Sequence, residues 1–384
     1  MATATPASPR GIARVATVAI TVGSASVLPG FLVGALSLQV RDDLDVGVTA
    51  VTAGVTVFFG AGMLGASSGG RLAERVGALA AMRAATAITG SCLLAIAALA
   101  GSLAPFLVLL GIAGLANSVT QPAINLYMAQ QIPRGRQGLA FGIKQSAIPG
   151  AILVSGLALP LLALPLGWRP TFALAGLAAL LAALVAARER ASLAPPALRN
   201  TPGRPTRELV LIALGAALAS AGPSALSAYL VVSAVDAGIA EGSAGVLAAL
   251  GSAASLAVRV GMGGRADRRA DYGFGWVVLL LAGGSLGFLL LATETAAPFV
   301  AGAVLAFMLG WGWPGLFNLA VVERHREAPG WATGISQSGI YVGAAGGPAA
   351  YGLLSGAVGY GPAWAITAGV LLVAAAAIGL ATRV

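Results

Sequence analysis

The sequence predicts an all-α membrane protein with twelve transmembrane helices arranged in two six-helix bundles. Two observations lead to this prediction: the composition and an internal duplication. The chain is 58% hydrophobic and 9% charged, whereas soluble domains carry about 25% charged residues. Its apolar runs are about 20 residues long, the length that a helix needs to cross the hydrocarbon core. Runs of this length exclude a β-barrel, whose strands alternate over about ten residues.

The apolar runs divide the chain into twelve spans, and because each span crosses the membrane, successive loops fall on alternate sides of it. Of the 22 basic residues, Arg41 and Arg169 fall on one side, Lys144 and Arg259 fall within spans, and the other 18 (22 − 4) lie on the side of the termini. Such a bias marks the cytoplasmic side. We therefore expect a multi-pass protein of the cytoplasmic (inner) membrane with both termini in the cytoplasm. The expected spans are 12–38, 48–69, 78–100, 104–129, 139–163, 169–187, 208–234, 243–264, 274–293, 297–320, 331–355 and 361–382.

The duplication is clearest in span 5. Its stretch 138–156, GLAFGIKQSAIPGAILVSG, recurs 192 residues later (330 − 138) as 330–347, GWATGISQSGIYVGAAGG. A polar stretch rich in Pro and Arg, 188–207, separates the two copies and reads as a linker. We therefore expect an N-terminal six-helix bundle over 1–187, a cytoplasmic linker over 188–207, and a C-terminal six-helix bundle over 208–384. Two such halves are the layout of a secondary transporter whose site lies between the repeats.

A loop motif, G-x-x-x-[DE]-R-x-G, follows span 2, and a partial copy follows span 8, where Ala270 replaces the last glycine. With the twelve-span layout, this motif makes the chain resemble the major facilitator superfamily over essentially its whole length. The resemblance implies alternating access by a monomer and a conformational latch on the cytoplasmic side, closed when the carrier faces outward. The latch residues would be Gly70, Glu74, Arg75 and Gly77 in the first half, and Gly263, Asp267 and Arg268 in the second.

Two charges fall inside predicted spans, and both are positive. Lys144, the chain's single lysine, lies in span 5 and Arg259 lies in span 8, at comparable depth, while all 13 acidic residues can be placed in loops. A charge within a span is costly and marks a functional site by default. Two cations that face one cavity predict an anion site. Alternatively, both side chains could reach the cytoplasmic surface, and Arg259 could pair with Asp267.

Arg259 also carries a resemblance of its own. The pattern Arg259-Val-Gly-Met-Gly263 is similar to one found among carboxylate carriers of the superfamily, such as monocarboxylate and oxalate transporters. Those carriers have a companion aspartate one turn earlier, and this chain has Ser255 there.

Polar and aromatic residues complete the candidate substrate site. Three amides share one face of span 4 because they are spaced by four residues, and others are related by the repeat. Amides in a bilayer also form bonds between helices, and aromatic residues near span ends also anchor a protein at the membrane interface. The candidates are Asn117, Gln121, Asn125, Gln145, Asn318, Gln337, Tyr229 and Tyr341, with Trp311 and Trp313 as further cavity-lining residues.

We therefore expect a secondary active transporter of a small organic anion, a carboxylate in the first instance. Proton-coupled uptake is expected, and the proton could travel on the substrate because no buried acid is present. The alternative on the same fold is an efflux carrier for neutral or hydrophobic molecules, in which Lys144 and Arg259 are gate charges.

Other classes of function lack the residues that they need. An enzyme is not expected, since no His, Cys or paired-carboxylate constellation falls within the bilayer. Cys92 and His325 each stand alone, which argues against a metal site, and no nucleotide motif or other cofactor site is present. The net charge of +9 comes from short loops and indicates topology rather than nucleic-acid binding.

Overall fold

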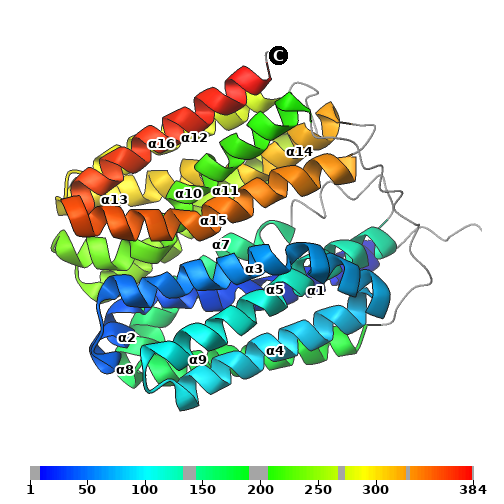
Figure 1. Cartoon of the computed structure of the whole chain (residues 1–384), viewed down its shortest axis with the longest axis horizontal. Coiled ribbons are helices and arrows are strands. Elements are labelled where there is room, and N and C mark those ends of the chain that lie inside the picture. Colours follow the sequence, from blue (N-terminus) through cyan, green and yellow to red (C-terminus); the bar gives the residue numbers. More distant parts are fainter. Residues whose placement is uncertain (1–8, 133–143, 190–205, 267–272, 326–328, 383–384) are drawn as a thin grey trace, which may run out of the picture.

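The computed structural model describes residues 9–132, 144–189, 206–266, 273–325 and 329–382. These ranges are helical apart from short turns, and the helices form two bundles that lie side by side (Figure 1). Eleven helices of the described part are long and apolar enough to cross a membrane. The remaining predicted span, the eleventh (331–355), corresponds to α15 (Pro329–Val358), a 30-residue helix rich in glycine. The prediction of twelve helices in two bundles is therefore confirmed.

The first bundle contains spans 1 to 6. Span 1 is followed by a short helix that leads into the first loop, and span 5 changes from α-helix to π-helix at a segment that contains Pro160. The elements are α1 (Pro9–Ala35), α2 (Ser37–Leu44), α3 (Val48–Val76), α4 (Ala78–Leu99), α5 (Leu103–Gln131), α7 (Ala147–Ala158), the π-helix η2 (Leu159–Ala163), α8 (Leu164–Leu166) and α9 (Trp168–Ala187).

The second bundle contains spans 7 to 12. Its span 10 is also broken, by a π-helix and a turn that precede Pro314. The elements are α10 (Arg207–Asp236), α11 (Glu241–Ala266), α12 (Phe274–Leu291), α13 (Ala296–Leu305), the π-helix η3 (Ala306–Gly310), α14 (Pro314–Arg324), α15 (Pro329–Val358) and α16 (Tyr360–Ala381). The boundaries 1–187, 188–207 and 208–384 stay a prediction, and most of the linker lies outside the described residues.

Small residues let the helices within each half approach closely. In the second half, Gly339, Gly343 and Gly347 lie on one face of α15, and a Cβ at any of them would overlap backbone carbonyl groups of α10. In the first half, the matching helix α7 packs on α1, where Ser24 Oγ donates to the carbonyl oxygen of Ala147 at 3.1 Å. Close backbone approach replaces the hydrophobic effect as the source of helix association in a bilayer.

Glycine also shapes equivalent turns in the two halves. Gly167 precedes α9 with φ +92°, and Gly359 precedes α16 with φ +86°. Both dihedral angles lie in the region that glycine adopts without a steric penalty. The two positions differ by 192 residues (359 − 167), which is the offset of the sequence repeat. The duplicated sequence therefore encodes the same turn twice.

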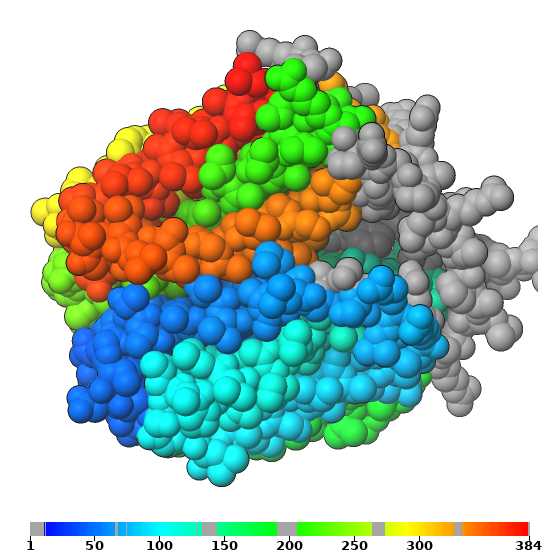
Figure 2. Space-filling view, viewed as in Figure 1, coloured from blue at the N-terminus to red at the C-terminus, as the bar shows by residue number. Residues whose placement is uncertain are grey.

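The bundles meet along α3 and α15, α7 and α11, and α1 and α10, and Figure 2 shows α15 resting on α3. The tightest of these approaches lie away from the end that carries the termini. Gly34 abuts the backbone of Ser227, and Gly156 abuts that of Gly245. Near them, Thr52 Oγ1 donates to Tyr229 Oη at 2.6 Å, which joins α3 to α10. We call the region around Gly34, Gly156 and Tyr229 the opposite end. The end of the molecule that carries the termini is called the termini end.

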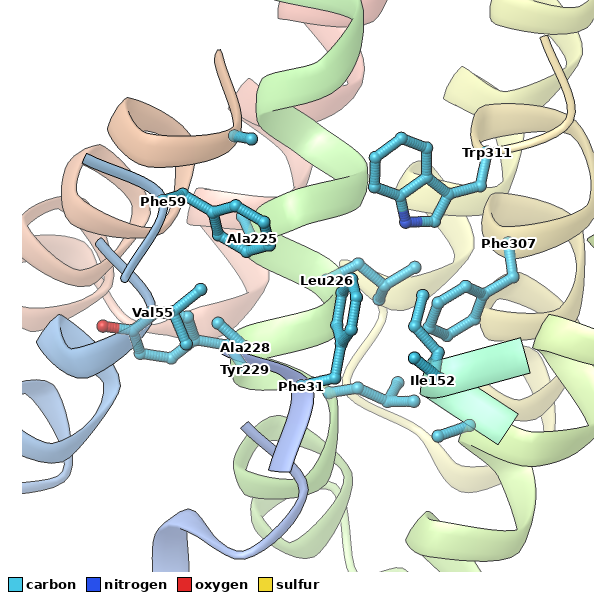
Figure 3. Close-up of a cluster of buried hydrophobic side chains, with 14 of the residues drawn as sticks. Phe31, Val55, Phe59, Ile152, Ala225, Leu226, Ala228, Tyr229, Phe307 and Trp311 are labelled. Carbon is cyan, nitrogen blue, oxygen red and sulfur yellow. The ribbon is translucent and has the colours of Figure 1, made fainter. Parts of the chain in front are cut away.

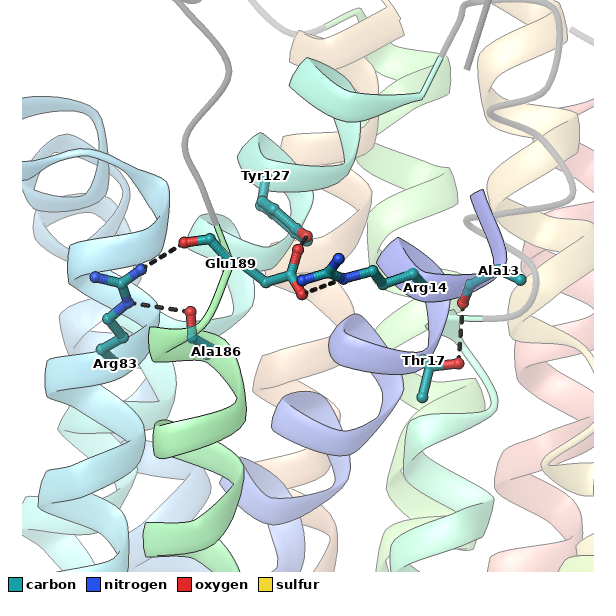
Figure 4. A network of polar contacts seen from close by, with 7 residues as sticks. All are labelled: Ala13, Arg14, Thr17, Arg83, Tyr127, Ala186 and Glu189. Atoms are coloured by element: carbon teal, nitrogen blue, oxygen red, sulfur yellow. Dashed lines mark hydrogen bonds and ion pairs between the residues drawn. The ribbon is translucent and has the colours of Figure 1, made fainter. Parts of the chain in front are cut away.

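Polar contacts hold each bundle together at the termini end. Glu189 accepts hydrogen bonds from Arg14 Nε at 2.7 Å and from the Tyr127 hydroxyl at 3.0 Å. Its backbone carbonyl accepts from Arg83 NH2 at 2.9 Å, so four helices converge on this one residue (Figure 4). In the second bundle, Arg324 of α14 pairs with Glu208 of α10. These ion pairs lie within one bundle, so they leave the two bundles free to move relative to each other.

The glycine contacts give a stability prediction. Gly343→Ala places a methyl group against the carbonyl oxygen of Ala217 and the hydroxyl of Ser220. Overpacking of this kind costs about 1–3 kcal/mol, so we expect the melting temperature of the purified protein to fall by roughly 3–10 °C. The matched control is Gly346→Ala on the same helix, where a Cβ meets nothing within 4 Å. Equal melting temperatures for the two variants would contradict this packing.

Candidate functional site between the bundles

Arg259 on α11 is the only charged side chain among the buried residues that the structure describes, with 8% of its surface exposed. Its Nε and NH2 donate to the carbonyl oxygen of Trp311, and its NH1 donates to that of Gln145 at 2.8 Å. The guanidinium also lies 5.8 Å from the centre of the Trp311 ring. Gln145 belongs to the first half and Trp311 to the second, so Arg259 links the two bundles.

Both carbonyl groups are free because the helices are interrupted beside them. In an α-helix, the carbonyl of Gln145 would accept from the N–H of residue 149, but that residue is Pro149, which has none. Trp311 lies in the turn between η3 and α14, ahead of Pro314, where regular α-helical hydrogen bonding is broken. Irregular backbone of this kind at membrane depth occurs where it is enclosed by protein or lines a cavity.

Two serines extend the site along α11. Ser252, Ser255 and Arg259 are spaced by three and four residues, so they share one face of the helix. The three residues line a narrow, tightly packed space together with Pro149, Phe307 and Trp311. The hydroxyl groups of Ser252 and Ser255 are buried and have no hydrogen-bond partner in the described part of the chain. Buried polar atoms without partners are rare and costly, so this space suits a polar ligand.

Lys144 is brought close to the same place. It directly precedes Gln145, whose carbonyl oxygen binds Arg259, and its side chain is partly buried. No hydrogen bond or ion pair of Lys144 is found among the residues that the structure describes. Lys144 does not line this narrow space, so it lies beside the site rather than within it.

The three amides of span 4 take different positions. Asn117 is buried and Gln121 partly buried. Gln121 Nε2 donates to Ser26 Oγ at 3.1 Å and lies 3.4 Å from Asn117 Oδ1, and Ser26 Oγ donates to Asn117 Oδ1 at 3.0 Å. This network joins α1 to α5 within the first bundle. Asn117 and Gln121 therefore form hydrogen bonds between helices, the alternative to substrate binding given for these amides. Asn125, one turn further along α5, is exposed.

The remaining polar candidates lie partly buried. This group comprises the side chains of Gln145, Asn318, Gln337 and Tyr341, and within the described ranges none of them forms a hydrogen bond to another side chain. They therefore remain available to a ligand, and their role as substrate contacts stays a prediction.

The aromatic candidates belong to the packed region between the bundles. Tyr229 is 2% exposed, its hydroxyl accepts from Thr52, and its ring lies 5.0 Å from that of Tyr351. Figure 3 shows it in an apolar cluster with Phe31, Val55 and Phe59 from the first half and Phe307 from the second. Tyr229 thus closes the opposite end. Trp311 contacts Arg259, whereas Trp313 is fully buried and packs edge-on against Phe317 at 5.1 Å.

The latch residues of the first half surround the junction of α3 and α4. Gly77 has φ +89° and links the two helices, which gives a physical reason for glycine at the end of the motif. Gly70 lies on α3, Arg75 is exposed, and the Glu74 side chain lies outside the described residues. In the second half, Gly263 ends up near the end of α11, while Asp267 and Arg268 lie outside the described residues. The latch itself therefore stays a prediction.

Sequence reasoning missed Ser26, Ser252 and Ser255. Serine is common in membrane helices, so each residue alone carries little signal. The spacing of Ser252 and Ser255 from Arg259 on one helical face was the available signal, and it becomes informative only once the hydroxyl groups are known to lack partners.

Comparisons with known proteins agree with this architecture. The sequence profile described as the Major Facilitator Superfamily matches residues 18–330, so the chain belongs to this superfamily. It is therefore a multi-pass membrane transporter of the secondary type that binds small-molecule substrates.

One solved structure with the same fold is that of a bacterial homologue of the human lysosomal transporter Spinster, in an inward-facing and unoccupied conformation. It has a TM-score of 0.75 and 13% sequence identity, and the match covers 98% of each chain. At this identity the likeness concerns the fold. No curated protein matches the sequence significantly.

The closed opposite end gives a second prediction. Tyr229→Phe removes the acceptor for Thr52 and leaves the ring in place, which weakens the contact between the bundles by about 1 kcal/mol. We expect the population that is open at the opposite end to rise about fivefold. Electron-spin distance measurements between labels at Asp42→Cys and Asp236→Cys, in a Cys92→Ala background, would report it as a larger share of long distances.

Tyr351→Phe is the control for this experiment. Its hydroxyl donates to the carbonyl oxygen of Tyr360 at 3.3 Å, within the same bundle. The distance distribution should stay unchanged in this variant. A distribution that is also unchanged in Tyr229→Phe would contradict the role given to the Thr52–Tyr229 hydrogen bond.

Proposed function

We propose that this protein transports a small organic anion, with a carboxylate as the expected cargo, by alternating exposure of the site at Arg259 to the two sides of the membrane. The observation that carries the proposal is the buried guanidinium of Arg259, which lies between the bundles beside two hydroxyl groups that lack partners. Substrate sites of secondary transporters lie at the interface of the repeats, and Arg259 links the two halves.

The charge of Arg259 is solvated but not neutralised. The two carbonyl oxygens accept three of its N–H groups, and a guanidinium has five. Every acidic residue whose side chain the structure describes is at least partly accessible and lies at a helix end or in a loop. Lys144 adds a second cation nearby. An anion would supply the opposite charge and could accept the remaining N–H groups in the forked geometry that arginine favours.

The coupling ion is proposed to be the proton. Since no carboxylate of the described spans lies beside Arg259, the proton would travel on the cargo or on water rather than on a buried acid. Uptake is the proposed direction, with the termini end in the cytoplasm and the opposite end outside. In the conformation described, the opposite end is closed by Gly34, Gly156 and the Thr52–Tyr229 hydrogen bond, which corresponds to a carrier that faces inward.

One observation favours a different cargo. The hydrogen bond from Arg259 NH1 to Gln145 crosses between the bundles, as expected of a gate charge. In that case the protein would export neutral or hydrophobic molecules, and Arg259 would only stabilise one conformation. The two functions differ in whether an anion competes for the guanidinium.

Counterflow of labelled butanoate in proteoliposomes tests the anion proposal. Removal of a buried, hydrogen-bonded charge that pairs with a ligand costs about 2–5 kcal/mol. We therefore expect Arg259→Gln to lower the apparent affinity at least 30-fold, and Lys144→Ala to lower it by a smaller factor. Arg259→Lys keeps the charge but loses the forked geometry, so it should retain part of the transport.

Arg41→Gln is the matched control, because it removes an arginine from a helix at the opposite end that does not line the site. Melting temperatures measured in parallel identify variants that fail to fold. Unchanged affinity and anion preference in folded Arg259→Gln and Lys144→Ala would contradict the proposal and leave the export function.

The proposed coupling predicts an electroneutral process, since a monoanion and a proton carry no net charge together. A pH gradient that is acidic on the outside should accelerate butanoate uptake into proteoliposomes. A potassium diffusion potential at equal pH should leave the rate unchanged. Uptake that follows the potential and ignores the pH gradient would contradict proton coupling of this kind.

A further inference from the structure

Helices α7 and α11 form one of the interfaces between the two bundles. Toward the opposite end, Gly156 of α7 abuts the backbone of Gly245. Toward the termini end, the carbonyl oxygen of Gln145 accepts the hydrogen bond from Arg259. The residue numbers fall in the first half as they rise along α11, so the two helices run antiparallel. The residues between these two contacts therefore face each other across the interface.

The middle of this interface sets polar side chains against apolar ones. Ser252 and Ser255 of α11 are 0% and 1% exposed. The residues that enclose them include Ile148, Pro149 and Ile152 of the α7 helix, whose side chains have no atom that forms a hydrogen bond. The packing leaves no room for a water molecule in the space that these residues line. The two hydroxyls are thus cut off from water, and they have no partner among the described residues.

Other buried serines show how such hydroxyls are usually satisfied in a helix. Ser155 of α7 also lies between the bundles, and its hydroxyl donates to the carbonyl oxygen of Ala151 at 2.8 Å, one turn earlier in the same helix. In the part of the chain that the structure describes, Ser252 and Ser255 are the two buried serines whose enclosed hydroxyl lacks a partner. Both lie where α11 meets the other bundle, so closure between the bundles is what removes their water.

We infer that Ser252 and Ser255 form a conformational device: their hydroxyls lose water when the opposite end closes, and they thereby bias the empty carrier toward reopening at that end. When Gly156 and Gly245 move apart, α7 separates from α11 and water reaches both hydroxyls. In the closed state, each hydroxyl keeps the desolvation penalty of a polar group without a partner. In the proposed uptake cycle, this reopening is the return step of the empty carrier. The inference itself concerns the protein without cargo and is independent of what the cargo is.

The direction of the expected effect follows from the two states. Alanine in place of either serine removes the penalty from the closed state, and it changes the open state little, because the hydroxyl is hydrated there. The penalty for a buried group without a partner corresponds to a factor of about five or more in an equilibrium constant. We therefore expect Ser252→Ala and Ser255→Ala each to lower the ratio of open to closed carrier about fivefold.

Electron-spin distance measurements on the ligand-free, full-length protein test the inference, with labels at Asp42→Cys and Asp236→Cys in the Cys92→Ala background. Both states must be populated for a decrease to be visible, so the protein also carries Gly34→Ala. A Cβ at Gly34 of α1 would overlap the carbonyl oxygen of Ser227 on α10, which pushes the bundles apart at the opposite end. In this background, the two serine variants should shift the distribution back toward short distances.

Two variants serve as controls in the same background. Ser155→Ala removes a hydroxyl between the bundles that stays bonded within its own helix in either state. Thr86→Val removes a buried hydroxyl without a partner, but its helix, α4, packs on helices of the first bundle. Neither control should change the ratio of long to short distances. Melting temperatures measured in parallel show that each variant is folded.

Three outcomes would overturn the inference. The first is an unchanged ratio in folded Ser252→Ala and Ser255→Ala. The second is an equal decrease in Ser155→Ala, because the effect would then follow from any loss of a hydroxyl between the bundles. The third is a single short distance in the Gly34→Ala background, because a closed state with that overlap and two unpartnered hydroxyls should open. No cargo is present in these measurements, so the anion proposal is tested separately by the counterflow assay.

Discussion

The guanidinium of Arg259, whose hydrogen bonds within the described ranges all go to backbone carbonyl groups of the two bundles, is the constraint on which the site depends. The hydrogen bonds that it donates to the carbonyl oxygens of Gln145 and Trp311 make the buried charge tolerable, but they do not cancel it. Both carbonyls are free because of local interruptions, at Pro149 in one half and ahead of Pro314 in the other. Pro149 thus leaves one acceptor without a donor in its own helix, and the turn between η3 and α14 supplies the other.

This arrangement couples the site to the relative position of the bundles. Arg259 is on α11 in the second half, and one of its two acceptors is on the first half, so separation of the bundles at this level must break that bond. An anion that replaces the carbonyl oxygen of Gln145 as the acceptor would remove the energetic cost of breaking that hydrogen bond. Within each bundle, glycine contacts such as that of Gly343 and ion pairs such as Arg14–Glu189 hold the helices together, and these ion pairs do not cross between the halves. Movement is therefore directed to the interface, where the cargo binds.

The sequence predicted the architecture well because the signals for it are local and repeated. Apolar runs and the 192-residue offset need no knowledge of contacts, and Gly167 and Gly359 show that the offset extends to the turns. The site was predicted less completely. Arg259 and Lys144 stand out as charges within apolar runs, but Asn117 and Gln121 turned out to bind Ser26 on another helix, and Tyr229 closes the opposite end. Which face of a helix meets which neighbour depends on tertiary packing, which spacing along one helix does not encode.

The central claim is that an anion occupies the space between Arg259, Ser252 and Ser255. The most direct measurement is a crystal structure of the carrier with 4-bromobutanoate, whose bromine gives an anomalous signal. The account predicts carboxylate density within hydrogen-bond distance of Arg259 and a bromine peak next to that density. An anomalous peak elsewhere, with the guanidinium of Arg259 still bound only to the carbonyls of Gln145 and Trp311, would contradict it.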